Sequence, residues 1–152
     1  MTELIVVGDH LVKRKRPCST VHELRLAANR PILREALRSI RPLTDSPQET
    51  RLRLLLIAGG LPEPVVGYTV TTEAGFVATP DLAYVDARVA VEYLGSDHWT
   101  NPQVFAEDIQ RREGLQDAGW RVVEAIAADL SHRNRALVAR VARAIAAGTI
   151  GG

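Results

Sequence analysis

Two apolar runs joined by a short polar turn dominate the middle of the chain and limit what it can fold into. The segment Pro80–Trp99 reads PDLAYVDARVAVEYLGSDHW, and the runs on either side of Val85–Ala87 have the composition of strands. Asp81 lies in the first run and Glu92 in the second. A carboxylate on a core strand is costly to desolvate unless it is paired or holds a cation. The segment therefore predicts a divalent-metal site at a sheet edge; the alternatives are that Asp81 caps a turn and that Glu92 pairs with an arginine.

The composition is that of one soluble globular domain. A chain of 152 residues with 46% hydrophobic content is long enough to bury a real core. The single cysteine, Cys18, excludes an internal disulfide, fits a reducing compartment and is expected to be buried or inert rather than catalytic. No run of eighteen apolar residues and no signal-peptide pattern is present, so we expect no membrane association and a cytoplasmic location.

The formal net charge of +1 hides an uneven distribution. Residues 1–60 have eleven basic and six acidic side chains, residues 61–108 have one and eight, and residues 109–152 have seven and four. Basic flanks around an acidic middle suit an anionic polymer held at its edges while a cation lies at the centre. The alternative is that these charges simply lie on solvated faces.

Residues 1–45 predict a helical N-terminal extension. The first 18 residues begin with a short apolar run, Leu4–Val7, followed by Gly8-Asp9-His10. They are expected to form a loose lead-in that ends in the basic cluster Lys13–Arg16. This cluster is either a solvated arm or a contact to phosphates. Thr20 and Glu23 match a capping box, and Pro31 marks the start of a second short helix.

Residues 46–147 predict a sheet covered by helices, followed by a disordered tail over residues 148–152. Ser46-Pro47-Gln48-Glu49 opens a helix that Gly59-Gly60 closes, and Glu49 is either its capping-box partner or an active-site acid. Strand-like runs cover residues 65–71, 76–84, 88–94 and 120–126, with a helix from Pro102 before the last strand and another after it. Helices on both faces of one sheet are the layer arrangement that this order favours.

The order of helix, three strands, helix and strand resembles the core of the PD-(D/E)-x-K nuclease superfamily, with Pro80-Asp81 and Glu92-Tyr93-Leu94 at the motif positions. The stretch LPEPVVGYTV…PDLAYVDARVAVEYLGSDHW…DIQRREGLQDAGWRVV is similar to an endonuclease-like domain related to very-short-patch mismatch repair endonucleases, which is found in actinobacterial proteins. The resemblance implies a restriction-endonuclease-like α/β fold: an αβββαβ core with a central mixed four-stranded sheet flanked by helices, preceded here by short N-terminal helices.

The resemblance also implies a site. Mg²⁺, or Mn²⁺, would be held by Asp81 and Glu92, and Glu49 matches the helix acid that relatives place near the metal. His98 would act as general base or bind the scissile phosphate. Asp108 and Arg111 match a D-x-x-R helix signature. The residues expected to contact DNA are Lys13, Arg14, Arg111, Arg112 and Trp99, although filling a loop is the favoured role for Trp99.

Leu94 departs from the motif, because the superfamily has lysine at this position and leucine can neither bind a metal nor stabilise a developing charge. Two functions follow. The first is a Mg²⁺-dependent DNA endonuclease in repair or defence, favoured by the four acidic and imidazole side chains of the motif. The second, favoured by Leu94, is a catalytically weakened DNA-binding or regulatory module. Such a module would resemble an antitoxin, with a toxin-type protein or a second copy of the chain as its partner.

Overall fold

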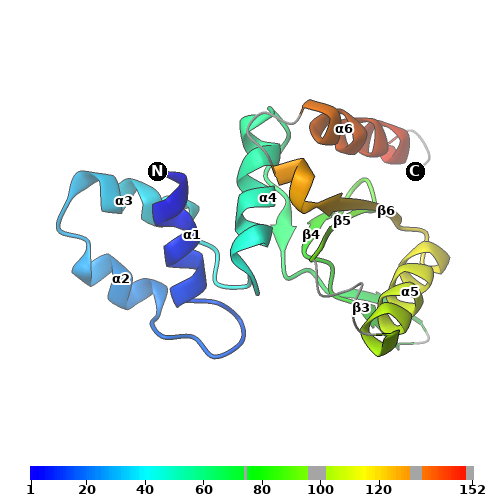
Figure 1. Ribbon diagram of the computed structural model, residues 1–152, viewed down its shortest axis with the longest axis horizontal. Coiled ribbons are helices and arrows are strands. Elements are labelled where there is room, and N and C mark those ends of the chain that lie inside the picture. The colour runs from blue at the N-terminus through cyan, green and yellow to red at the C-terminus, as the bar shows by residue number, and fades with distance from the viewer. Residues whose placement is uncertain (74, 96–101, 131–134, 150–152) are drawn as a thin grey trace.

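The computed structural model describes residues 1–73, 75–95, 102–130 and 135–149, without the side chains of residues 102–105. These residues form a mixed α/β structure (Figure 1). The helices are α1 Thr2–Leu11, α2 Val21–Ala27, α3 Pro31–Ser39, α4 Pro47–Ala58, α5 Pro102–Asp117, the 3-10 helix η2 Ala127–Leu130 and α6 Arg135–Thr149. The strands are β1 Val65–Val66, β2 Val70–Thr72, β3 Gly75–Ala78, β4 Leu82–Tyr84, β5 Val89–Leu94 and β6 Arg121–Ile126.

The central sheet is mixed and four-stranded, in the order β1-β4-β5-β6. β4 pairs antiparallel with β1 and with β5, whereas β6 pairs parallel to β5. A parallel pair needs a long crossover connection, which α5 supplies. The coarse prediction of a mixed four-stranded sheet flanked by helices is therefore confirmed.

Helices cover both faces of this sheet. Alternation along β5 turns Val89 and Val91 to one face, where they pack in a single core with α4 and α6. The same alternation turns Ala90 to the other face, where Leu115 of α5 and Trp120 cover it. In Figure 1, α4 stands between the sheet and the N-terminal helices α1–α3. The carboxyl end of β5, with Glu92, thus lies between helices on both faces.

The strands predicted over residues 65–71 and 76–84 are wrong in one respect, because each is split in two. The inner pieces, β1 and β4, join the central sheet, and the outer pieces, β2 and β3, pair with each other as a separate two-stranded hairpin. The first break falls at Gly67, whose φ of 68° favours glycine, and the second at Thr79 and Pro80. Proline lacks the backbone N–H that a continuous ladder needs.

The expected loose lead-in is also wrong, because residues 2–11 form helix α1 against α3 and α4. In the structure Gly8 admits Ile40, whose Cδ1 would lie 2.1 Å from a Cβ at position 8. The helix predicted after Thr20 is present as α2, with both halves of its capping box: Glu23 N–H donates to Thr20 Oγ1 at 3.1 Å, and Thr20 N–H donates to Glu23 Oε2 at 2.8 Å.

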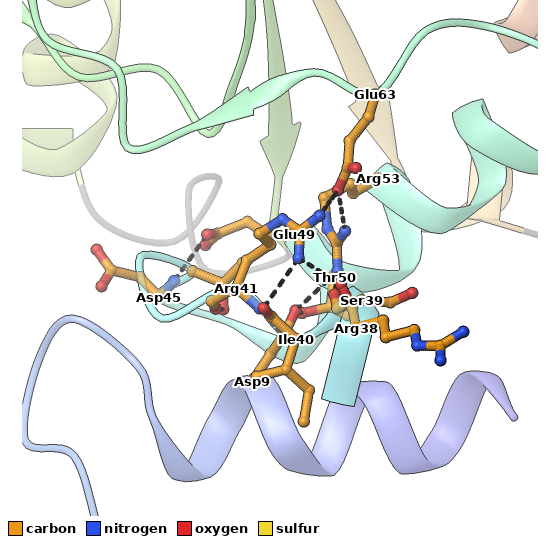
Figure 2. A network of polar contacts seen from close by, with 11 residues as sticks. Asp9, Arg38, Ser39, Ile40, Arg41, Asp45, Glu49, Thr50, Arg53 and Glu63 are labelled. Atoms are coloured by element: carbon orange, nitrogen blue, oxygen red, sulfur yellow. Dashed lines mark hydrogen bonds and ion pairs between the residues drawn. The ribbon is translucent and has the colours of Figure 1, made fainter. Parts of the chain in front are cut away.

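A buried polar network ties α1 and α3 to α4 (Figure 2). The fully buried Arg53 of α4 donates to Asp9 Oδ2 at 3.3 Å, to Ser39 O at 2.6 Å and to Glu63 Oε1 at 2.8 Å. Asp9 also accepts from Thr50 Oγ1 at 2.8 Å and, through Oδ1, from the backbone N–H at position 41 at 2.7 Å. Burial raises the pKa of Asp9, and these donors oppose that shift. The N-terminal helices and α4 therefore share one network of charged and hydrogen-bonded groups.

The last helix extends further than expected. α6 continues through Gly148 to Thr149, two residues into the segment predicted as a disordered tail, and residues 150–152 lie outside the described part of the chain. Gly148 packs on the β4–β5 turn, where a Cβ would lie 2.0 Å from Ala87 O. Among the described helices, none is long and apolar enough to cross a membrane.

Candidate functional site

The antiparallel register of β4 and β5 brings Asp81 and Glu92 together. Leu82 pairs with Val91, so the residues one step further along each strand are cross-strand neighbours. Asp81 is half-buried and Glu92 is only 4% exposed. Asp81 Oδ2 accepts a hydrogen bond from Tyr93 N–H at 2.8 Å, which ties the residue to β5 rather than to a turn of its own. Two acids eleven positions apart in the sequence thus share one end of the sheet.

Among the described residues, Glu92 has one ion-pair partner and no hydrogen-bond partner. Its Oε2 lies 3.0 Å from Arg111 Nη2 in an ion pair, and no described group forms a hydrogen bond with either of its buried oxygens. The same Arg111 nitrogen lies 3.2 Å from Asp108 Oδ1, so one guanidinium serves two carboxylates. The predicted arginine partner is therefore present, but it leaves the lone pairs of Glu92 largely unsatisfied.

Glu49 combines a structural role with a place in this acidic group. Its N–H donates to Ser46 Oγ at 3.2 Å, which confirms the predicted helix start. Its carboxylate, however, accepts from Asp45 N–H at 2.8 Å instead of from the N-cap residue, so the capping box is only half formed. Glu49 is 8% exposed; the charge of Asp81 raises its pKa, and its own charge raises the pKa of Glu92.

The three carboxylates raise one another's pKa. Burial is the largest cause for each, and it raises the pKa of Glu49, Asp81 and Glu92 to about 7. The charge of Glu92 adds to the shift of Asp81, and the charge of Asp81 adds to that of Glu49. For Glu92, Arg111 opposes the rise, while Asp108 and Glu49 add to it. Because the groups are coupled, each proton belongs to the cluster rather than to one residue. At neutral pH the three carboxyls are therefore partly protonated, and part of their negative charge is neutralised.

The donor set fits Mg²⁺ in the way that this ion usually binds proteins, through one or two carboxylates and several waters. Asp81 and Glu92 supply the carboxylates, and the oxygens of Glu92, which accept no hydrogen bond from a described group, are acceptors that a cation would satisfy. Within residues 1–73, 75–95, 102–130 and 135–149, no three acidic, imidazole or thiol side chains converge as a complete metal cage. Any ion here would accordingly depend on water for most of its ligands.

The other predicted site residues are placed as follows. His98 and Trp99 lie outside the described residues. Arg111 and Arg112 line a small cavity of about 20 Å³ together with Leu94. This cavity also contains Glu92, so a cationic side chain at position 94 would reach the same space.

Lys13 and Arg14 lie at the end of α1, and of these Arg14 forms an ion pair with Asp45 and reaches Thr44 O through its backbone N–H. Because Asp45 N–H binds Glu49, this basic segment adjoins the start of α4. Cys18, expected to be buried or inert, is exposed.

Glu124 was missed as a member of the acidic group. The parallel register sets it directly beside Glu92, and its Oε1 accepts from Arg112 Nη1 at 2.6 Å. Its charge raises the pKa of Glu92. The signal was available in the sequence, because WRVVEAI places an acid within an apolar strand just as VAVEYL does.

Comparison with known proteins gives two similar chains. They are the uncharacterized protein MT2308 of Mycobacterium tuberculosis strain CDC 1551 / Oshkosh and the uncharacterized protein Rv2248 of strain H37Rv, each 32% identical over 112 residues. Each match covers 71% of this chain and 41% of that protein, so the chain spans less than half the length of these curated relatives. No protein-family model and no solved structure matches the chain.

Proposed function

We propose that this chain is a Mg²⁺- or Mn²⁺-dependent DNA endonuclease with a restriction-endonuclease-like fold, acting in DNA repair or defence. The observation that carries the proposal is the meeting of Asp81, half-buried just before β4, and Glu92, buried on β5, with Glu49 of α4 close enough to be electrostatically coupled to both. An acidic group of this kind is costly to a fold unless it holds protons or a cation. The strand order, with an antiparallel meander and one parallel strand after α5, agrees with the proposed fold.

Each of these residues would have a separate role in phosphodiester hydrolysis. A divalent ion held by Asp81 and Glu92 would supply Lewis acidity and a bound water of lowered pKa. Glu49, with a pKa of about 7, can accept a proton from an attacking water at neutral pH. Arg111, 3.0 Å from Glu92, supplies a fixed positive charge beside the space that Leu94 lines. It would therefore stabilise negative charge developing on the phosphate, the task that lysine performs in the motif.

A plasmid-nicking assay with Mg²⁺ or Mn²⁺ tests the proposal. We expect the wild type to nick supercoiled DNA and Asp81→Asn, which keeps the shape and removes the charge, to lose that activity. Asp86→Asn is the matched control, because Asp86 lies exposed at the opposite end of the same β4–β5 hairpin. Equal nicking by the wild type and Asp81→Asn would remove this site from the mechanism.

Leu94 favours a second function, a DNA-binding or regulatory module of the same fold with a second copy or a toxin-type protein as partner. Leu94 lines the small cavity with Glu92, Arg111 and Arg112, so a lysine there would restore the cation of the motif in the right surroundings. If the wild type binds duplex DNA without cleaving it and Leu94→Lys gains nicking activity, the second function holds. If the wild type already cleaves DNA and Leu94→Lys does not increase the nicking activity, Arg111 suffices as the cation of the site and the first function holds.

A further inference from the structure

β6 is the last strand in the sheet order, and its outer edge is open over part of its length. Arg121 N–H donates to Arg88 O at 2.8 Å, on the side of β5. Backbone groups alternate in direction along a strand, so those of Val122, Glu124 and Ile126 face away from β5.

The carboxyl half of this edge is already occupied. Glu124 O accepts from the Arg140 guanidinium, and Ile126 N–H donates to Asp129 Oδ2 at 3.1 Å. In the described parts of the chain, no group bonds the outward N–H and C=O of Val122. An open strand edge of this kind is a template for another extended chain.

A groove of about 630 Å³ runs along this edge and defines what we call the β6 groove. Its lining includes four successive residues of β6, Arg121–Glu124, and Arg140, Arg143 and Ala144 of α6. Since successive strand residues point to opposite faces, a groove that touches all four follows the strand edge itself. The half-buried Val122 and Val123 make its floor partly apolar.

The rim of the β6 groove is basic. Arg121 and Arg143 are exposed and, within the described residues, make no ion pair. Arg140 lies 3.6 Å from Asp129 Oδ2. Glu124 is the one acid among the described lining residues, and its carboxylate is bound by Arg112. The groove therefore offers uncompensated positive charge to an anionic occupant.

We propose that the β6 groove binds an extended acidic peptide segment of a partner protein, which adds to β6 as a further strand. A peptide backbone offers both a donor and an acceptor to Val122, and alternate side chains can place apolar groups on the floor and acids against the arginines. A nucleic-acid backbone offers acceptors alone and would leave Val122 C=O unpaired. A second copy of β6 would bring two sets of three arginines together, which opposes self-pairing. The proposal does not depend on the nuclease proposal.

The probe for this site is a fluorescein-labelled peptide of alternating glutamate and valine, followed by fluorescence polarisation with the full chain. We expect Arg143→Glu to weaken binding by about tenfold, since an attractive charge pair at the rim becomes a like-charge contact. Val122→Pro should also abolish binding, because it removes the outward N–H and leaves the ladder to β5 intact. Arg38→Glu on α3, exposed and far along the chain, is the matched charge control and should bind as the wild type does.

A second measurement does not depend on how the variants fold. A peptide N-methylated at alternate amides keeps its charge and loses strand pairing, and we expect it not to bind the wild type. Equal binding of the methylated and parent peptides would overturn the proposal, because the contact would be ionic alone. Tighter binding of an oligothymidine, lost in Arg143→Glu, would assign the groove to nucleic acid. If the chain forms a dimer that does not bind the peptide, and Val122→Pro makes the dimer dissociate, the β6 groove would be assigned to a second copy.

Discussion

The replacement Glu92→Gln tests the acidic group most directly, because it removes one buried charge and keeps the side-chain volume. Glu92 is 4% exposed, and its pKa is raised from 4.5 to about 7. Below the unfolded pKa the carboxyl is protonated in both states and contributes nothing to the pH dependence. As the pH rises from there through the folded pKa near 7, the unfolded chain releases its proton first, so the wild type loses stability. Above that pH the whole penalty is present.

The size of the stability change follows from the pKa shift of Glu92. A displacement of this size in one carboxyl corresponds to roughly 3 kcal/mol against the folded state at pH 8. Coupling to Glu49 and Asp81 spreads that penalty over the group, and the glutamine also forfeits the ion pair with Arg111, whose side chain is 37% exposed. We therefore expect Glu92→Gln to be more stable than the wild type at pH 8 by about 1–2 kcal/mol, or about 2–8 °C in Tm. At pH 5 the two proteins should be nearly equal.

Thermal and urea unfolding at pH 5 and pH 8, in a metal chelator, measure the difference. Glu113→Gln, on the same helix as Arg111 but exposed, is the control and should change stability little at either pH. Added Mg²⁺ should then stabilise the wild type at pH 8 more than at pH 5, and should have little effect on Glu92→Gln. A variant less stable than the wild type at pH 8, or a difference that does not change with pH, would refute the electrostatic account.

Three further outcomes follow from the structure. Arg53→Met should destabilise the fold by about 3–5 kcal/mol in urea unfolding, because it leaves Asp9 buried without its cation; a loss below about 1 kcal/mol would show that water reaches the network. Gly67→Ala should cost about 1–3 kcal/mol, since φ is 68° and the new Cβ would lie 2.8 Å from Leu43 Cβ; an unchanged midpoint would mean that this turn moves freely. Duplex-DNA affinity, measured by anisotropy, should fall steeply with rising salt if the basic flanks bind phosphates, and a flat response would leave those arginines without that role.

The sequence predicted the elements whose signals are local. Ser46-Pro47 gives a cap and a proline at the first helical position, and α4 begins there. The apolar run VAVEYL becomes β5 with the predicted bounds to within one residue. These signals suffice because each depends on neighbours within a few positions.

Features that depend on distant packing could not be predicted in the same way. Gly8-Asp9 is a common turn signal, but in α1 the glycine makes room for Ile40, and the aspartate is satisfied by Thr50 and Arg53, more than forty positions away. Tertiary contacts thus override a local preference. The split of the first two strands has a similar origin, because Gly67 turns the chain against Leu43, a residue of the N-terminal region.

The acidic group depends on both a local sequence signal and tertiary packing. A single carboxylate in an apolar strand is a local signal, whereas its cost depends on which other acids the register brings beside it. Here the residue before β4 is Asp81, β6 contributes Glu124 and α4 contributes Glu49. In the described residues Arg111 alone forms an ion pair with Asp81, Glu92 or Glu49. Negative charge in excess of one guanidinium can be relieved by protons or by a divalent ion. Protonation and ion binding differ in pH dependence, because protons neutralise the excess negative charge below pH 7 and a divalent ion neutralises it above pH 7. A protein that used the acids for structure alone would gain nothing from Mg²⁺ at high pH, so the pH dependence of the Mg²⁺ effect bears on function as well as on stability.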